Sequence, residues 1–215
     1  SHSARGPLRL QAVPQWMLQS LPNLPSTNAD SDTLSHDRIT QLLDLGADLL
    51  REENSAYDEI TSSETSLNRA GGSIGTLTAS DAQFVRSLLS SEGGGTLSDR
   101  ISALTLLVQS SPVHNVKHLD NLLNMTRKKS REEASRATRA LADWLASEGG
   151  LGSRKLRYFR DQPQLASAAA ALSSGDLVAA EAAKSHIVLW AFEDHLKKFY
   201  FQFLQILEVQ SHDTI

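Results

Sequence analysis

Residues 176–210 read DLVAAEAAKSHIVLWAFEDHLKKFYFQFLQILEVQ, and we expect them to form the longest helix of the chain. The segment holds six of the chain's twelve aromatic residues. They are Trp190, Phe192, Phe199, Tyr200, Phe201 and Phe203. On a helix these rings point to more than one side, so a single apolar stripe does not describe the segment. We therefore expect this helix to be buried, either inside the protein or against a partner.

Helical signals also precede this segment. Ser35 is a plausible N-cap, and Ser130 with Glu133 forms a capping-box pattern. Pro112 and Pro163 enforce breaks. Helices are predicted over about 36–60, 80–89, 98–111, 113–125, 130–148, 154–159 and 164–172.

The remaining segments lack helical patterns. Residues 1–33 contain prolines 7, 14, 22 and 25 and are predicted to form an extended arm, while Gly, Ser and Thr make residues 61–79 a predicted flexible loop. No alternating pattern requires a sheet. Short helices with short connections predict an all-α fold, a HEAT/armadillo-like helical-repeat solenoid over residues 34–215 with an extended N-terminal arm.

Composition excludes several classes of function. Cysteine is absent, which excludes disulfides, thiolate nucleophiles and cysteine-ligated metals. No stretch is apolar for long enough to span a membrane, and we expect no membrane association. The net charge of -4 hides an asymmetry, since residues 30–99 hold 13 acidic and 4 basic residues whereas residues 117–160 hold 5 acidic and 11 basic residues.

A search for catalytic motifs predicts no enzyme, no cofactor and no metal site. His114 and His118 are four residues apart, but Asn115 follows where a helical zinc protease needs glutamate, so a solvated or capping pair is expected. Gly93–Gly95 lacks the lysine of a phosphate loop and is interpreted as a helix terminator. His186 and His195 are expected to be structural.

Two basic clusters are candidates for binding nucleic acid. Cations at these spacings neutralise phosphates, and Tyr158 and Phe159 offer rings for stacking on an unpaired base. A solvated surface, or a charge complement to the end of the preceding helix, is the alternative. The candidates are Arg127, Lys128, Lys129, Arg131, Arg154, Lys155, Arg157 and Arg160. In the arm, Trp16, Leu18 and Leu21 are candidate partner-binding residues, with a mobile terminus as the alternative.

Three blocks of sequence resemble the nucleolar complex protein family, which also bears the name CCAAT-binding factor. The first is GTLSDRISALTLLVQ at residues 95–109, followed by SPVHN at 111–115. RKKSREEA at 127–134 and RKLRYFRDQP at 154–163 follow in the family's order. WAFEDHLKK at 190–198 is similar to the family's aromatic helix, and Ser211-His212-Asp213 resembles the start of its next element.

The resemblance implies large-subunit ribosome assembly, helical repeats, residence in the nucleolus and no enzymatic activity. It implies association with a second nucleolar complex protein, contact with pre-ribosomal RNA, and ribosomal proteins or other assembly factors as further partners. It also implies a chain that continues past Asp213. The leading hypothesis is a non-catalytic scaffold. The alternatives are a DNA-binding regulator of the CCAAT-box type, although no zinc finger or basic zipper is present, and a protein-docking module without nucleic-acid contact.

Overall fold

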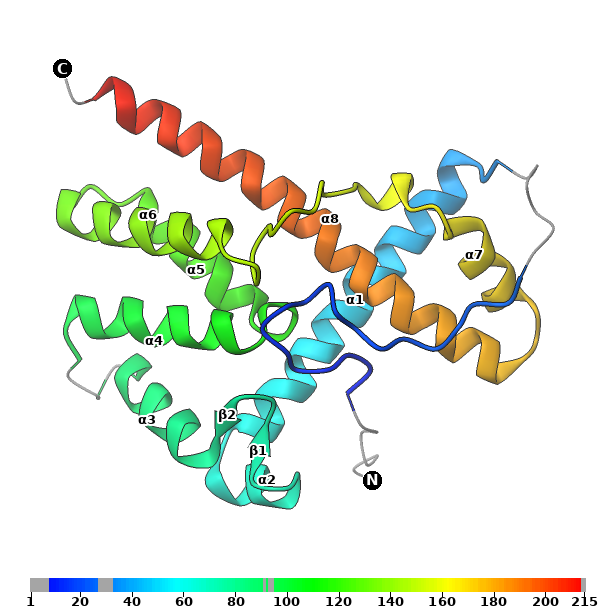
Figure 1. The fold of residues 1–215 in the computed structure, drawn as a ribbon, viewed down its shortest axis with the longest axis horizontal. Helices are drawn as coiled ribbons and strands as arrows, with labels where there is room; N and C mark the ends of the chain where they lie inside the picture. Colours follow the sequence, from blue (N-terminus) through cyan, green and yellow to red (C-terminus); the bar gives the residue numbers. More distant parts are fainter. Residues whose placement is uncertain (1–7, 27–32, 91, 93–94, 214–215) are drawn as a thin grey trace. The chain divides into compact units, whose positions relative to one another are not determined.

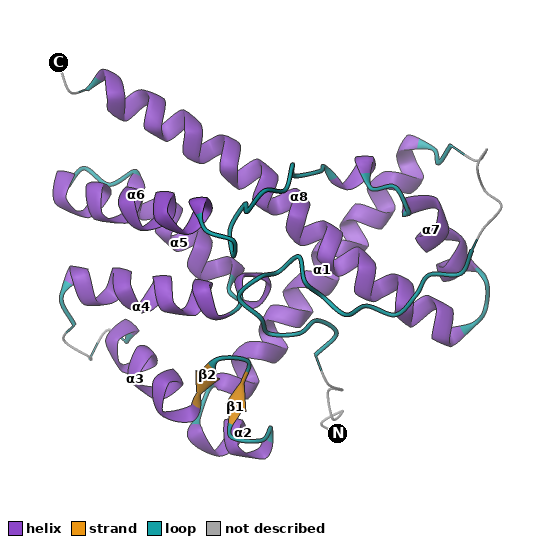
Figure 2. Cartoon of the chain, viewed as in Figure 1, coloured by secondary structure: helices purple, strands orange, loops and turns teal. Residues whose placement is uncertain are grey.

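The computed structural model describes residues 8–26, 33–90, 92 and 95–213, and over these residues the chain is mainly helical (Figures 1 and 2). The one sheet of the described part consists of two antiparallel strands of two residues, so the all-α prediction is confirmed. The elements are α1 (His36–Thr61), α2 (Glu64–Arg69), β1 (Ser73–Ile74), β2 (Leu77–Thr78), α3 (Ala79–Leu89), α4 (Leu97–Ser110), η1 (Pro112–His114), α5 (Val116–Thr126), α6 (Arg131–Ala146), η2 (Phe159–Asp161), α7 (Leu165–Ser173) and α8 (Leu177–His212).

Polar side chains start several helices by accepting hydrogen bonds from the first free backbone N–H groups. Ser35 Oγ accepts from Arg38 N at the start of α1, and Ser130 Oγ accepts from Glu133 N at the start of α6. A full capping box stands at α4, where Thr96 Oγ1 accepts from Asp99 N and the Asp99 carboxylate accepts from Thr96 N. These hydrogen bonds lower the pKa of Asp99. Local sequence therefore determines where these helices begin.

The chain divides into two compact units. Unit 1 contains Ser1–Leu10, Gln19–Glu53 and Lys155–Lys198, and unit 2 contains Gln11–Leu18, Asn54–Arg154 and Phe199–Ile215. Both α1 and α8 contribute residues to each unit. The predicted division into an arm of residues 1–33 and a helical domain of residues 34–215 stays a prediction.

In unit 1, α1 and α8 approach each other closely at Gly46. A Cβ atom at this position would lie 3.0 Å from Cβ of Ala191 and 3.1 Å from Cγ2 of Ile187. Ile187 and Phe192 are fully buried in the same part of α8. Glycine thus lets two helices meet with almost no side chain between their backbones.

In unit 2, consecutive helices pack against one another. Helix α4 contacts α3, α5 and α6, and α5 also contacts α6. One face of α6 is buried, with Ala137, Leu141, Trp144 and Leu145 in the core. The burial of Phe199 and Phe203 also places the last part of α8 in this core.

The segment 61–79, which was predicted to be a loop, contains α2 and the β1–β2 hairpin. Ser63 caps α2, and Leu67 and Leu77 are buried. At the hairpin turn, Gly75 has φ of +59°, and a Cβ atom there would overlap the carbonyl oxygen of Ala12. Burial of two leucines orders a segment whose Gly, Ser and Thr content alone suggested a loop.

The helix predicted over residues 154–159 is not formed. Residues 155–158 have no regular secondary structure, and the single turn η2 follows them. The backbone N–H groups of Arg157 and Phe159 donate to carboxylates of α8, so they do not join a helical ladder. Tertiary hydrogen bonds therefore replace the local ones that the sequence suggested.

Candidate functional site

Residues 155–160 of the second basic cluster are held along α8 in unit 1 by two buried carboxylates. The backbone N–H of Arg157 donates to Oε1 of Glu193 at 3.2 Å, and Gln162 Nε2 donates to Oε2 at 2.9 Å. The N–H of Phe159 donates to Oδ1 of Asp194 at 3.0 Å. Two of the blocks that carry the family resemblance therefore contact each other, because the acids in the second bind the backbone of the first.

Basic residues of α8 complete this attachment. Lys197 Nζ donates to the carbonyl oxygen of Leu156 at 2.9 Å, and Lys198 Nζ lies 2.7 Å from Oδ2 of Asp194. The side chains of Lys155, Arg157 and Arg160 are exposed. The result is a fixed backbone from which three guanidinium or ammonium groups extend into solvent.

The aromatic rings of this segment differ in accessibility. Phe159 is buried and packs edge-on against Trp190, with 6.4 Å between ring centroids, so it does not stack on a base as the sequence suggested. Tyr158 is half-buried, with the Lys197 ammonium 4.5 Å and the Arg160 guanidinium 5.3 Å from its ring centroid. These cation–π contacts orient the two cations at the surface.

Arg154 belongs to unit 2 and differs from the other three cations of its cluster. It is half-buried, and its guanidinium carbon lies 6.0 Å from the ring centroid of Trp16. Trp16 is only 1% exposed, and its Nε1–H donates to the carbonyl oxygen of Gly150 at 2.9 Å. Trp16 is therefore a core residue of unit 2 and not an exposed anchor.

The rest of the described arm also contacts its own chain. In unit 1, Arg9 N and Leu10 N donate to the buried Glu53 carboxylate on α1, at 3.1 and 2.9 Å. The Arg9 guanidinium lies 2.5 Å from Glu181 and, together with Lys184, lowers the pKa of that carboxyl. Leu18 is 67% exposed and Leu21 is half-buried, so these two keep accessible surface for a partner.

The first basic cluster lines a groove in unit 2 that encloses about 1260 Å³. Arg127, Lys128, Lys129 and Arg131 all border it, together with Arg139, which the sequence analysis missed. Arg139 follows Arg131 by eight residues, a spacing that places both on one face of α6 and was visible in the sequence. We call this the α6/α8 groove, because the helices α6 and α8 provide its walls.

The two histidines that the sequence analysis paired lie in different surroundings. The prediction was a solvated or capping pair, but His114 lies in η1 and is 1% exposed, so it is not solvated. Its Nδ1 lies 2.7 Å from Ser111 Oγ, and its ring stacks on Tyr57 with 4.9 Å between centroids. His118 belongs to the separate helix α5, which begins at Val116 after η1 ends at His114, so the two histidines do not share the helix face that the sequence suggested. The described residues hold no cluster of three or more side chains of the metal-binding types His, Cys, Asp and Glu.

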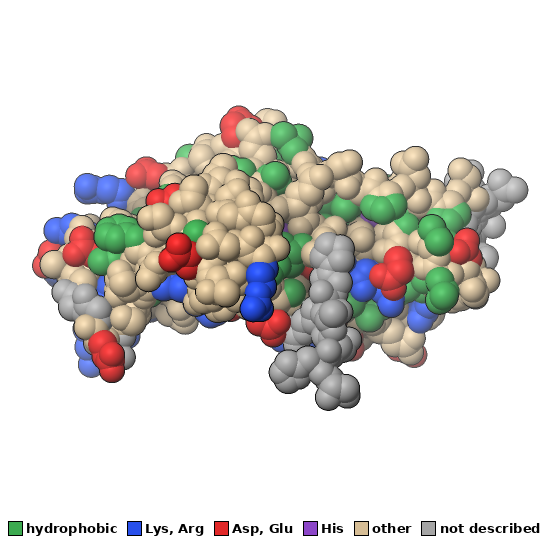
Figure 3. Space-filling view, turned by 90° about the horizontal axis from the view of Figure 1, so that it is seen from below, with side chains coloured by type: hydrophobic (Ala, Val, Ile, Leu, Met, Phe, Trp, Pro, Cys, Tyr) green, Lys and Arg blue, Asp and Glu red, His purple; other side chains and the backbone are tan. Residues whose placement is uncertain are grey.

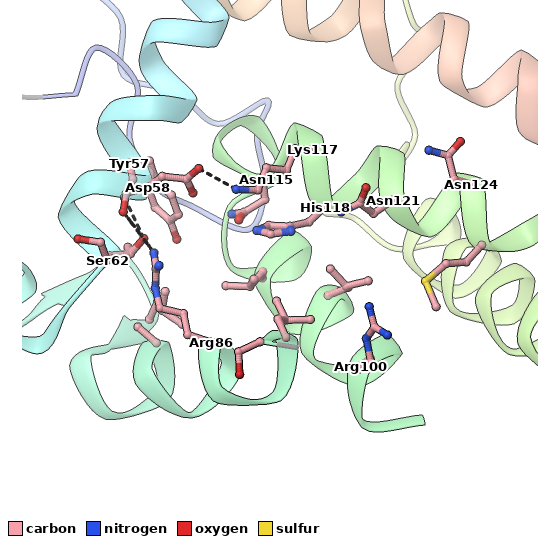
Figure 4. Close-up of a pocket in the computed structure, with 18 of the residues that line it drawn as sticks. Tyr57, Asp58, Ser62, Arg86, Arg100, Asn115, Lys117, His118, Asn121 and Asn124 are labelled. Carbon is pink, nitrogen blue, oxygen red and sulfur yellow. Dashed lines mark hydrogen bonds and ion pairs between the residues drawn. The ribbon is translucent and has the colours of Figure 1, made fainter. Parts of the chain in front are cut away.

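His118 borders a second pocket of unit 2, which encloses about 1000 Å³ (Figure 4). Figure 4 shows His118 among Arg86 from α3, Arg100 from α4, and Asn121 and Asn124 from α5. Burial lowers the pKa of His118 from 6.5 to about 4, and the nearby charge of Lys117 adds to this effect. His118 is therefore neutral at neutral pH and cannot help to bind an anion by charge.

At one edge of this pocket, polar contacts tie α1 to α3 and α5. Lys117 Nζ lies 3.0 Å from Oδ2 of Asp58, and Arg86 donates to the carbonyl oxygen of Asp58 and to Thr61 Oγ1. Burial raises the pKa of Tyr57. These contacts of Asp58, Thr61, Arg86 and Lys117 link three helices, so their role here is structural.

Three observations bear on the remaining sequence predictions. His186 Nε2 is 2.7 Å from the carbonyl oxygen of Pro22, which fits a structural histidine. None of the helices in the described ranges is long and apolar enough to cross a membrane. On the face drawn in Figure 3, acidic and basic side chains are interspersed among uncharged ones, so that face is not a patch of one sign.

Comparison with known proteins gives several relatives, although no family model matches the sequence. An uncharacterized protein of Schizosaccharomyces pombe is 38% identical over 192 residues, which cover 89% of this chain and 19% of that protein. Ribosome biogenesis protein NOC1 of Chaetomium thermophilum is 34% identical over 208 residues, or 94% of this chain and 18% of that protein.

CCAAT/enhancer-binding protein zeta of Homo sapiens is 34% identical over 122 residues, which cover 56% of this chain and 11% of that protein. The chain thus spans less than a fifth of the length of each of these three relatives. The matches to NOC1 and to CCAAT/enhancer-binding protein zeta, each 34% identical, agree with the family resemblance of the sequence. The chain therefore belongs to the nucleolar complex protein family, also called the CCAAT-binding factor family, whose members include these two proteins.

Proposed function

We propose that this chain is part of a non-catalytic scaffold that acts in the nucleolus during assembly of the large ribosomal subunit. The observation that carries the proposal is the similarity to a protein named for ribosome biogenesis, which extends over 94% of this chain. The scaffold binds pre-ribosomal RNA and other assembly factors, among them a second nucleolar complex protein and ribosomal proteins. It orders these partners and transforms no substrate.

The contact with RNA that we propose is centred on Lys155, Arg157 and Arg160. Their backbone is fixed by Glu193 and Asp194, so the side chains leave the surface from a defined position. Anchored cations lose less freedom when they bind phosphates than cations on a mobile loop would lose. Arg154 and the cluster of Arg127, Lys128, Lys129 and Arg131 are the further candidates for RNA contact.

The HEAT/armadillo-like solenoid is also part of the proposal. In support, α3, α4, α5 and α6 follow one another in sequence and each packs on the next. Stacking of this kind produces an extended surface, which suits a protein that holds several partners at once. Leu18 and Leu21 are the proposed partner contacts of the arm, since Trp16 is buried.

DNA binding is a second candidate function, and the name of the human relative favours it. The same cations would then contact duplex phosphates. Binding to a duplex that contains the CCAAT sequence, tighter than to a scrambled duplex, would support this reading.

The proposal is tested by measuring binding of the 215-residue chain to structured pre-ribosomal RNA and to duplex DNA over a range of salt concentrations. A variant with Lys155, Arg157 and Arg160 changed to Ala is compared with a control in which the exposed Arg51, Arg69 and Arg100 are changed to Ala. Three lost phosphate contacts would reduce the log–log salt slope by about 2, whereas the control should keep it.

Each outcome is informative. Loss of RNA binding in the first variant alone supports RNA contact by the 154–160 segment. Equal loss in both variants indicates binding by overall charge and contradicts the proposed site. Absence of RNA and DNA binding at moderate salt would overturn nucleic-acid contact and leave a protein-docking module.

A further inference from the structure

The walls of the α6/α8 groove present matching faces. On α6 the lining positions are 131, 134, 135, 138, 139 and 142, on α8 they are 202, 205, 206, 209 and 210, and Asp213 follows the end of α8. Both sets have the same spacing of three and four residues, so each wall is one continuous helix face. The lined stretch of α6, residues 131–142, is about three turns or roughly 18 Å long.

Hydrogen bonds join the two walls of the groove and fix their positions. Gln210 Nε2 on α8 donates to the carbonyl oxygen of Thr126 at 3.1 Å and to Thr138 Oγ1 on α6 at 3.3 Å. Nearer its other end, Arg127 Nη2 donates to Gln202 Oε1 at 3.2 Å. A groove that is already formed needs little rearrangement to accept a partner.

The charge of the groove is one-sided. Five cations border it, and Asp213 is the one acidic residue among its lining residues. Of these cations, Lys128, Lys129, Arg131 and Arg139 form no ion pair within the part of the chain that the structure describes. The ion pair of α6 in this region joins Arg136 to Glu132 instead. The cations of the groove are therefore available to negative charges on a ligand.

Between these cations the lining combines aliphatic side chains with uncharged polar ones such as Ser135, Gln202 and Gln205. Ala134, Ala142, Ile206 and Val209 line the groove, and Val209 is 61% exposed. No aromatic side chain is among the lining residues that the structure describes, so the groove offers no ring on which a nucleobase could stack. Burial of aliphatic side chains against other apolar groups gives favourable free energy, and a phosphate backbone does not supply such groups.

We propose that the α6/α8 groove binds an acidic amphipathic helix of about three turns from a partner protein. Leucine-like residues on one face of that helix cover Ala134, Ile206 and Val209, and carboxylates beside this face pair with Arg131, Arg139 and the lysines. The inference deepens the scaffold role proposed above by naming the class of partner, and it assigns the first basic cluster to carboxylates in place of phosphates.

The test uses the full 215-residue chain and a fluorescent helical peptide of about 14 residues. The peptide carries leucines at positions i, i+3, i+4 and i+7 and glutamates beside them. An isomer with the same composition has its leucines spread around the helix. Fluorescence anisotropy should show binding of the amphipathic peptide that is at least about tenfold tighter than that of the isomer.

Substitutions separate the apolar and the charged contributions. Val209→Asp, and the pair Arg131→Glu with Arg139→Glu, should each weaken binding of the peptide about tenfold or more. The matched control is Val178→Asp, a change of the same kind on α8 at a position that is 80% exposed and lies in unit 1. Val209, Arg131 and Arg139 line the groove, and Val178 does not. Because all four side chains are exposed, circular dichroism should show that the helix content of every variant is unchanged.

The outcomes distinguish this inference from the proposed function. Failure of the amphipathic peptide to bind better than its isomer overturns the inference, and so does binding that Val209→Asp leaves unchanged. RNA binding that is lost with Arg131→Glu and Arg139→Glu but kept with Val209→Asp, without peptide binding, would assign the groove to RNA. The Lys155, Arg157 and Arg160 variant tests RNA contact outside the groove, so either proposal can fail alone.

Discussion

The backbone N–H of Phe159 donates a 3.0 Å hydrogen bond to Oδ1 of Asp194, a residue 35 positions later in the chain. Both groups are buried, so each would lose its bond to water without receiving another if the contact were broken. Together with the bonds that Glu193 accepts, this contact fixes the course of the basic segment in unit 1. The position of the exposed cations thus depends on two acids that point inward.

Removing this acceptor should destabilise unit 1. Asp194→Ala leaves the Phe159 N–H unpaired and should lower the free energy of unfolding by about 1–3 kcal/mol. Asp194→Asn keeps an acceptor oxygen and should cost less. Urea denaturation followed by circular dichroism measures both, with Asp161→Ala, an exposed change in η2, as the control. Equal costs for Ala and Asn would show that the charge of Asp194, and not its acceptor atom, is what matters.

Trp16 should be the most sensitive position of the arm. Its ring is buried in unit 2, so Trp16→Ala should lower the free energy of unfolding by about 3–5 kcal/mol. Trp16→Phe keeps most of the apolar volume but leaves the Gly150 carbonyl without its donor, and should cost less. Leu18→Ala, at an exposed neighbouring position, should change the stability by no more than about 0.5 kcal/mol. A small effect of Trp16→Ala would contradict the packing of the arm described above.

Gly46 should not tolerate a larger side chain. Gly46→Val forces atoms against Ala191 and Ile187 and should lower the free energy of unfolding by about 1–3 kcal/mol. Ala47→Val introduces the same β-branched residue at the next, exposed position of α1 and controls for helix propensity. Thermal unfolding of the two variants should separate the steric cost at Gly46 from the effect of helix propensity. If both variants melt at the same temperature, the close approach of α1 and α8 does not limit the size of the side chain at position 46.

His118 should make the protein less stable in mild acid. Its pKa is about 4 in the folded chain against 6.5 for an unperturbed histidine, so between these values the unfolded chain binds the proton more readily. Stability from this group is present above pH 6.5 and is lost as the pH falls toward 4, by at most about 3 kcal/mol.

The measurement for His118 is urea denaturation at several pH values between 7 and 4, for the protein and for His118→Gln. The variant lacks the titrating ring, so the difference in stability between the two proteins should shrink or reverse as the pH falls. A constant difference across this range would rule out the lowered pKa. Titration of the imidazole signal by NMR gives the pKa directly.

The sequence predicted several parts of the fold because they depend on neighbouring residues. Ser35 caps α1, and the helix that ends the described chain runs over Leu177–His212, close to the predicted 176–210. The pattern of Ser130 and Glu133 located the start of α6, where Ser130 acts as the N-cap. Capping and helical periodicity act within about four residues, and such signals are legible in a single sequence.

Other elements depended on contacts between distant parts of the chain. The 154–159 segment has a helical composition, yet its N–H groups pair with Glu193 and Asp194. The loop composition of residues 61–79 does not show that Leu67 and Leu77 are buried. The basic residues were visible as candidates, but only the structure shows that Phe159 is buried and that Arg139 joins the first cluster.

The sequence by itself determined the helical class, most of the helix starts, the absence of cysteine chemistry and the membership of a family, since each follows from residue type or local spacing. The tertiary structure decided which polar groups are paired and which cations share a groove. The physical reason is that a buried N–H or carboxylate without a hydrogen-bond partner lowers the stability of the fold. The partner that satisfies such a group can lie anywhere along the chain.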